Sequence, residues 1–138
     1  MKEITFSVPF VKGLQRHQMR GKQAYDPKEN VTNKKMIALA FKTANGYTNR
    51  LNGYKGEVHM RILAECPLPV STKKSIKELP YIVKPDADNI AKLVLDGLNG
   101  LAFKDDSCVV ALHIYKAPRT REKPKRTTVQ ITYPNLED

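Results

Sequence analysis

The stretch from Lys84 to Leu101 constrains the fold of this chain more than any other. Apolar residues recur there at the spacing of one helix face, and they are Ile90, Leu93, Val94, Gly97, Leu98 and Leu101. Pro85 disfavours helix just before this run, and Asp88 stands where a helix cap is expected. We therefore predict an amphipathic helix from Asp88 to about Leu101.

Alternating apolar residues predict strands on both sides of this helix. The strand segments are 3–10, 57–66, 108–116 and 127–133. A second helix is expected from Thr32 or Asn33 to about Asn45, where Gly46 ends it. Two segments are less regular. The first, 11–31, is expected to be an extended loop, with a short hairpin as an option, and 71–83 to be one or two helical turns or a loop.

The last two strands are predicted to pair as a hairpin across a long link, because Pro118 and Pro124 break the strand between them. The element order β-α-β-α-β-β predicts an α+β fold. We expect a single domain over residues 1–138, built from a mixed sheet of about four strands and two main helices.

The chain carries 24 Lys and Arg residues against 14 Asp and Glu residues, a formal net charge of +10. This excess favours a phosphate-rich partner, because binding DNA phosphates releases their counterions. The basic segment 11–31 is either a phosphate-contacting arm or a surface that only aids solubility. No apolar run approaches the roughly 18 residues of a membrane span, and the N-terminus lacks a signal-peptide core. Cys66 and Cys108 form no CxxC pair, so we expect a cytoplasmic protein with free thiols.

Four carboxylates flank the central helix: Asp86 and Asp88 at its start, and Asp105 and Asp106 after it. Carboxylates this dense repel one another unless a cation lies between them, and hard cations such as Mg²⁺ prefer carboxylate oxygens. One interpretation is a Mg²⁺ site of Asp86, Asp88 and one of the later pair, with Lys92 beside it. The other is a capped helix followed by a solvated acidic turn.

These residues resemble the motif of the RusA family of Holliday junction resolvases, which are small bacterial endodeoxyribonucleases. The matching positions are Lys84-Pro85-Asp86-Ala87-Asp88-Asn89, Lys92, Asp96, Asn99-Gly100, Asp105-Asp106 and Val109. The resemblance implies a RusA-like fold and a homodimer that binds four-way DNA junctions and resolves them by paired symmetric nicks with Mg²⁺. It also implies a role in recombination and repair, often in proteins encoded by prophages.

The resemblance assigns roles to single residues as well. The essential carboxylates correspond to Asp86, Asp88 and Asp106, as metal ligands, and the essential lysine corresponds to Lys92. The residues expected to hydrogen-bond to these ligands without binding the metal are Asn89, Asp96 and Asp105. The expected DNA contacts are Arg16, Arg20, Lys22, Lys84, Arg119, Arg121 and Lys123.

Two other functions are compatible with the sequence. A basic α+β domain can bind DNA or RNA without catalysis, and its carboxylates would then lie away from the phosphates. A nuclease of this kind can also prefer flaps or replication forks, because junction selectivity depends on the geometry of the dimer.

Overall fold

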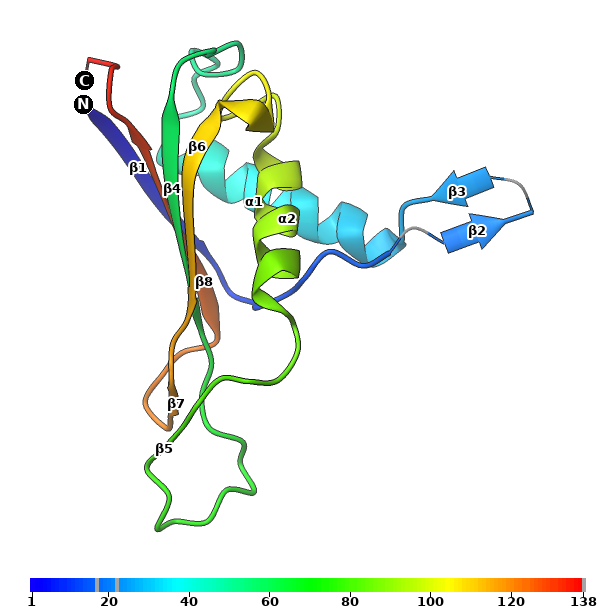
Figure 1. Cartoon of the computed structure of the whole chain (residues 1–138), viewed down its shortest axis with the longest axis vertical. Coiled ribbons are helices and arrows are strands. Elements are labelled where there is room, and N and C mark those ends of the chain that lie inside the picture. Colours follow the sequence, from blue (N-terminus) through cyan, green and yellow to red (C-terminus); the bar gives the residue numbers. More distant parts are fainter. Residues whose placement is uncertain (17, 22, 138) are drawn as a thin grey trace.

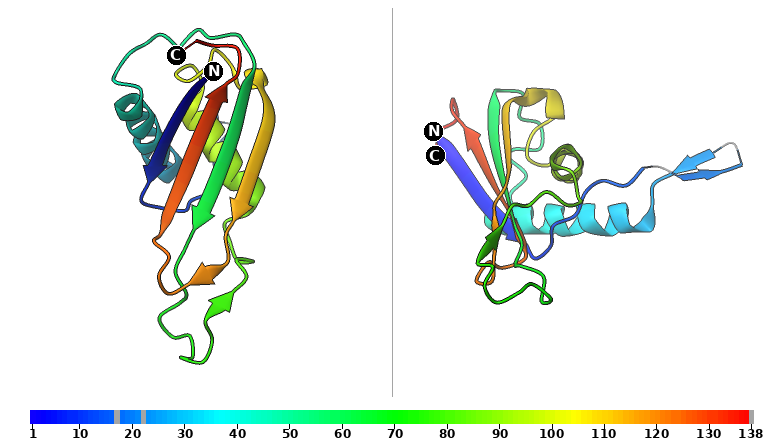
Figure 2. Two further views of the ribbon diagram at one scale, coloured as in Figure 1. Left: turned by 90° about the vertical axis from the view of Figure 1, so that its left-hand side faces the viewer. Right: turned by 60° about the horizontal axis from the view of Figure 1, so that its bottom comes forward.

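The computed structural model describes residues 1–16, 18–21 and 23–137, apart from the side chains of residues 18, 20, 24 and 25. The described part confirms an α+β domain with a mixed four-stranded sheet and two α-helices. Along the sheet the strands are β1 (Lys2–Val8), β8 (Arg126–Tyr133), β4 (Val58–Glu65) and β6 (Val109–Lys116). The helices α1 (Lys28–Ala44) and α2 (Ala87–Leu98) both cover the same face of the sheet, and the other face is open (Figures 1 and 2).

Smaller elements extend from this layer. A hairpin of β2 (Gln18–Arg20) and β3 (Gln23–Tyr25) projects away from the sheet (Figure 2), as the optional hairpin in 11–31 predicted. The segment 71–83 forms turns and the short strand β5 (Glu78–Leu79), which pairs with β7 (Arg119–Thr120). A 3₁₀ turn, η1 (Asp106–Cys108), precedes β6.

The sheet's connections correct one prediction. β4 and β6 are parallel neighbours, joined by a crossover through α2, as parallel strands require. β8 lies on the other side of β4 and is antiparallel to both β4 and β1. The predicted hairpin between the last two strands is therefore wrong, because β4 lies between them.

The sheet closes over a core that the alternation predicted well. Every second residue of the three strands β1, β4 and β8 is buried against the helices. The fully buried large side chains include Met60, Ile131 and Tyr133 from the strands, and Ile37, Phe41, Ile90, Leu93 and Leu98 from the helices. No helix in the described part of the chain is long and apolar enough to cross a bilayer.

Helix α1 begins four residues earlier than the first predicted cap, at Lys28 directly after Pro27. Its first turns bury polar rather than apolar side chains, so the apolar pattern starts too late to mark the beginning. The amide of Asn30 is buried and donates to the Gln15 carbonyl and to Oδ1 of Asp26, both at 2.9 Å. These bonds tie the start of α1 to the chain segment in front of the hairpin.

Helix α2 also begins earlier than predicted. Asp86, rather than Asp88, is the residue before the first helical residue, and the helix ends at Leu98 rather than near Leu101. Gly100 takes a left-handed backbone conformation with φ of 78°, which turns the chain away from the helix axis. The amphipathic character holds, because Ile90, Leu93 and Leu98 are buried.

Candidate active site

The start of α2 presents two exposed carboxylates. The side chain of Asp86 is 51% exposed and accepts no hydrogen bond from the helix start, but its Oδ2 lies 3.0 Å from Nζ of Lys84, which is 83% exposed. The side chain of Asp88, in the first turn, is 68% exposed. The positive end of the helix dipole favours both negative charges there.

Lys92 lies one turn further along the same outer face of α2. Its Nζ is 3.8 Å from Oδ2 of Asp88, and its side chain is 60% exposed. Asp96 is exposed another turn along, so it lies beyond Lys92 rather than beside the first carboxylates. The structure therefore brings Asp86, Asp88 and Lys92 to one end of α2.

The segment 11–15 adds residues that the sequence did not single out. The backbone N–H of Leu14 donates to the carbonyl of Asn89 at 3.0 Å. A Cβ added to Gly13 would lie 2.9 Å from Cβ of Asn89 and 3.1 Å from Cβ of Pro85, so only glycine allows this close approach. A shallow hollow of about 350 Å³ beside Asp86 is lined by Val11, Lys12, Gly13, Leu14, Gln15, Glu29, Lys84, Pro85, Asp86 and Asn89.

Glu29 brings a further carboxylate to the rim of this hollow. It is held by Nζ of Lys12 at 3.3 Å and by the side-chain amide of Gln15 at 2.8 Å. No pattern in the sequence marks Glu29, because it lies in a helix start with polar neighbours. The one signal in the sequence for this hollow is Gly13, because a glycine in a loop can mark a close approach of two backbone segments.

The second acidic pair lies at the opposite end of α2. Asp105 accepts the backbone N–H of Ser107 at 3.1 Å. Hydrogen bonding from the Ser107 side chain, and then from its backbone N–H, lowers the pKa of the Asp105 carboxyl. Asp106 is exposed and makes no side-chain hydrogen bond or ion pair with any residue that the structure describes. Because Asp105 is occupied as the cap of η1, Asp106 is the freer ligand of the two.

The loop that carries this pair is firmly attached to the core. The phenol of Tyr133 donates to the carbonyl of Ala102 at 2.9 Å, and the N–H of Lys104 donates to the carbonyl of Tyr54 at 2.8 Å. Ala102 and Phe103 are fully buried. Burial raises the pKa of Tyr133, and the neighbouring Tyr54 adds to this effect.

One chain does not gather the three predicted ligands. The twelve residues of α2 span about 18 Å, and they separate the start of the helix from the turn that leads to Asp106 (Figure 1). Within the described residues, no group of three or more His, Cys, Asp and Glu side chains is close enough to hold a metal ion. The donor chemistry suits Mg²⁺, but the spacing within a single chain does not.

The expected DNA contacts are not all free for DNA. Arg16 is exposed in front of the hairpin, and Lys84 is bound to Asp86. Arg119 and Arg121 bond to backbone carbonyls of the segment 72–80. Of the remaining residues, Lys123 is half-buried, Arg20 lies in β2 without a described side chain, and Lys22 falls outside the described residues.

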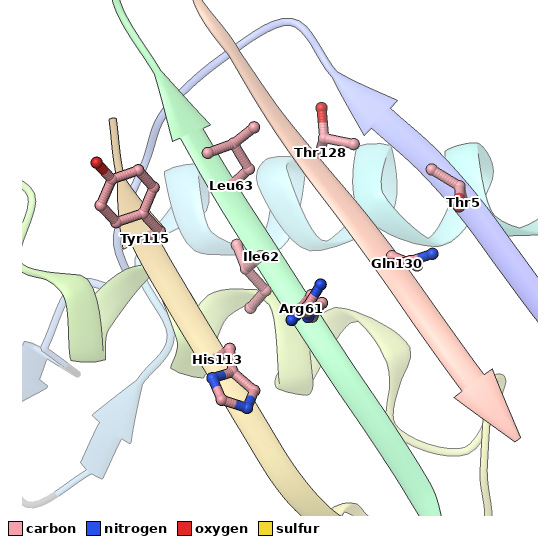
Figure 3. A pocket seen from close by; sticks show the side chains of 8 residues that line it. All are labelled: Thr5, Arg61, Ile62, Leu63, His113, Tyr115, Thr128 and Gln130. Carbon is pink, nitrogen blue, oxygen red and sulfur yellow. The ribbon is translucent and has the colours of Figure 1, made fainter. Parts of the chain in front are cut away.

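A larger hollow of about 560 Å³ lies on the open face of the sheet (Figure 3). It is lined by Thr5, Arg61, Ile62, Leu63, His113, Tyr115, Thr128 and Gln130. None of these side chains is a carboxylate, and the sheet separates this face from α2. The hollow is therefore not part of the candidate active site.

The fold and the acidic helix start define a class: a small basic α+β protein with carboxylates and a lysine exposed together. The sequence profile of the family described as endodeoxyribonuclease RusA matches residues 8–132, so the chain belongs to this family. Its class is that of hydrolases that cut DNA internally, and its family is that of Holliday junction endonucleases, which bind branched DNA and act in recombination. The chain is also similar to the uncharacterized protein YqaN of Bacillus subtilis (strain 168), with 32% identity over 126 residues, which cover 84% of this chain and 86% of the relative.

Proposed function

We propose that this protein is a Mg²⁺-dependent endonuclease that resolves four-way DNA junctions by paired symmetric nicks as a homodimer. Residues 1–138 act as one nuclease domain. The observation that carries this proposal is the exposed group of Asp86, Asp88 and Lys92 at the start of α2, in a chain of an endodeoxyribonuclease family.

Each residue has a physical role in this proposal. Asp86, Asp88 and Asp106 offer the oxygen ligands that Mg²⁺ prefers. A Mg²⁺ ion held by these residues would polarise a water molecule and a phosphoryl oxygen. Lys92 is a compact cation beside the same carboxylates, so it holds the scissile phosphate in place and offsets charge that develops there. Asn89 keeps the start of α2 against the segment 11–15.

A second copy of the chain can supply the carboxylate that the first copy holds too far away. β6 is an edge strand of the sheet, so its outer N–H and C=O groups have no strand partner within the described chain. It exposes three large apolar side chains, Val110, Leu112 and Tyr115, at 60%, 40% and 59%. An unpaired edge of this length that is apolar over most of its residues can pair with another strand.

The direction of β6 makes such a dimer productive. Its first residues follow Asp106, and its last residue, Lys116, donates to the carbonyl of Val83 at 2.6 Å, three residues before Asp86. β6 thus runs from one end of α2 to the other. Antiparallel pairing of two copies of β6 about a two-fold axis brings Asp106 of one copy towards Asp86 and Asp88 of the other. The same axis places two such sites on two strands of a junction.

The experiment incubates the protein with labelled four-way junctions, flaps, forks and linear duplexes, with Mg²⁺ or with EDTA. We expect paired cuts in the four-way junction with Mg²⁺ only. If flaps or forks are cut as fast as the four-way junction, the proposed preference for four-way junctions is wrong. If the protein binds DNA but cuts none of these substrates, the proposed nuclease activity is refuted and the protein is a non-catalytic DNA-binding protein. Asp88→Asn should abolish cutting and preserve junction binding.

A further inference from the structure

A strongly basic region lies at one end of the molecule. We call the segments 69–80 and 116–126 the basic pole. Together they carry nine of the chain's 24 Lys and Arg residues and two of its 14 acidic residues. The two segments are joined by the β5–β7 pair and lie at the lower end of the molecule in Figure 1, from which the chain continues into α2.

The arginine at the centre of the basic pole bonds to the protein backbone through both terminal nitrogens of its guanidinium. Nη1 of Arg121 donates to the carbonyl of Ile76 at 2.7 Å, and its Nη2 donates to the carbonyls of Lys73 and Thr72 at 2.8 and 3.3 Å. These bonds close around two turns, in which the N–H groups of Thr72 and Ile76 bond to Pro69 and Lys73. The guanidinium can hold both turns at once because its donors lie on separate nitrogens in a rigid planar fork, whereas a lysine presents its donors from a single atom.

Two further cations hold the rest of this segment. Arg119 donates to the carbonyl of Pro80 at 3.4 Å and lies 5.7 Å from the centre of the Tyr81 ring. Nζ of Lys116 lies 4.4 Å from the same ring centre and donates to the carbonyl of Val83. The inner cations of the basic pole therefore fix the backbone of residues 72–83, up to the start of the candidate active site.

The outer cations remain free. Lys73, Lys74 and Lys77 are exposed on the turns that Arg121 closes, and they form no ion pair with any residue in the described ranges. Neighbouring like charges without counterions favour an anionic ligand. Lys77 and Asp86 are nine residues apart, so the lysines lie at most about 30 Å from the acidic pair. That distance is shorter than one turn of a DNA duplex, about 34 Å.

We propose that the turns at 72–77 bind the phosphates of the DNA duplex arm next to the cleaved strand through Lys73, Lys74 and Lys77. Arg121 is the positioning residue that shapes these turns, rather than a phosphate contact. This proposal rests on the proposed function, because it requires a DNA substrate.

The first test measures junction affinity against salt concentration in EDTA. Log K falls as log salt rises, and each lost phosphate contact makes this negative slope shallower by about 0.9. The slope of the triple variant Lys73→Ala, Lys74→Ala, Lys77→Ala should therefore be shallower by about 2.7, and its melting temperature should not change. The control variant Lys35→Ala, Lys42→Ala, Arg50→Ala removes the same charge from exposed positions on and after α1, and its slope should stay close to that of the unmodified protein.

Equal slopes for the triple variant and the unmodified protein would overturn the site. That failure differs from a failure of the proposed function, in which the unmodified protein itself would neither bind nor cut junctions.

The second test separates positioning from contact. Arg121→Lys keeps the charge but presents its donors from one atom instead of the planar fork that spans the two turns. We expect faster hydrogen exchange at the amides of Thr72 and Ile76, and a loss of affinity close to that of the triple variant. The matched control Lys125→Ala removes an exposed charge from the same pole, and its exchange rates should be normal. Unchanged exchange and affinity in Arg121→Lys would overturn its positioning role.

Discussion

Mixing two inactive variants tests whether the metal site spans two chains. Asp88→Asn changes the start of α2, and Asp106→Asn changes the turn before β6. Each variant alone should be inactive, because every site in its dimers lacks one ligand. In a mixed dimer with shared sites, one site collects both substitutions and the other collects neither. Equal mixing with random exchange gives about half mixed dimers, so about a quarter of all sites should be intact.

The structure sets this expectation. The helix between the two positions is about 18 Å long, whereas Mg²⁺ binds its oxygens at about 2.0–2.1 Å. A site within one chain would leave one substitution in every site, so the mixture would be as inactive as its components.

The assay follows a four-way junction with a different label on each strand, in the presence of Mg²⁺. The mixture should recover about a quarter of the nicking rate. It should yield single nicks instead of paired ones, because each mixed dimer holds one working site. Native mass spectrometry of chains with and without a tag confirms that mixed dimers have formed. Confirmed mixed dimers without nicking would refute the shared site.

Three further substitutions test the local structure. Gly13→Ala should lower the unfolding free energy by about 1–3 kcal/mol and reduce cutting, because its Cβ would push Asn89 and Pro85 away; thermal unfolding measures this, and unchanged stability would contradict the close contact. Asp88→Asn should change stability by less than about 0.5 kcal/mol in urea unfolding, because its ion pair with Lys92 is exposed and 3.8 Å long; a larger loss would make the carboxylate structural. Tyr133→Phe should cost about 1–3 kcal/mol, because the Ala102 carbonyl loses its partner. Since the pKa of Tyr133 is raised in the folded protein, its contribution should be complete below pH 10 and decrease at higher pH, and this alkaline decrease should be smaller in Tyr133→Phe.

The fold class followed from the sequence because alternation and helical spacing report directly which side of an element is buried. These patterns do not show which strands are neighbours in the sheet, because the same buried face is compatible with several strand orders. The predicted pairing of the last two strands is therefore wrong, because β4 lies between them. The start of α1 was missed because the buried Asn30 is held by hydrogen bonds rather than by apolar packing.

The candidate site was predictable in its residue types but not in its distances. The density of carboxylates identified Asp86, Asp88 and the later pair, and the structure exposes all of them. The sequence also predicts the helix between the two acidic pairs, but the density of carboxylates along the chain does not show that this helix holds the pairs apart. The charge of Arg121 predicts a DNA contact, but in the structure its guanidinium bonds to backbone carbonyls. Its carbonyl partners come from a loop without periodicity, whose shape the sequence does not encode in any simple pattern.

The position of β8 links the completion of the enzyme to the progress of its synthesis. β8 follows the other strands along the chain, yet it lies between β1 and β4, and its Tyr133 anchors the loop before Asp105. A ribosome-bound chain that has not yet released residues 126–133 leaves β1 without its partner strand and the acidic loop without its anchor. An incomplete chain of this kind therefore lacks both a central strand of the sheet and the hydrogen bond that holds the acidic loop.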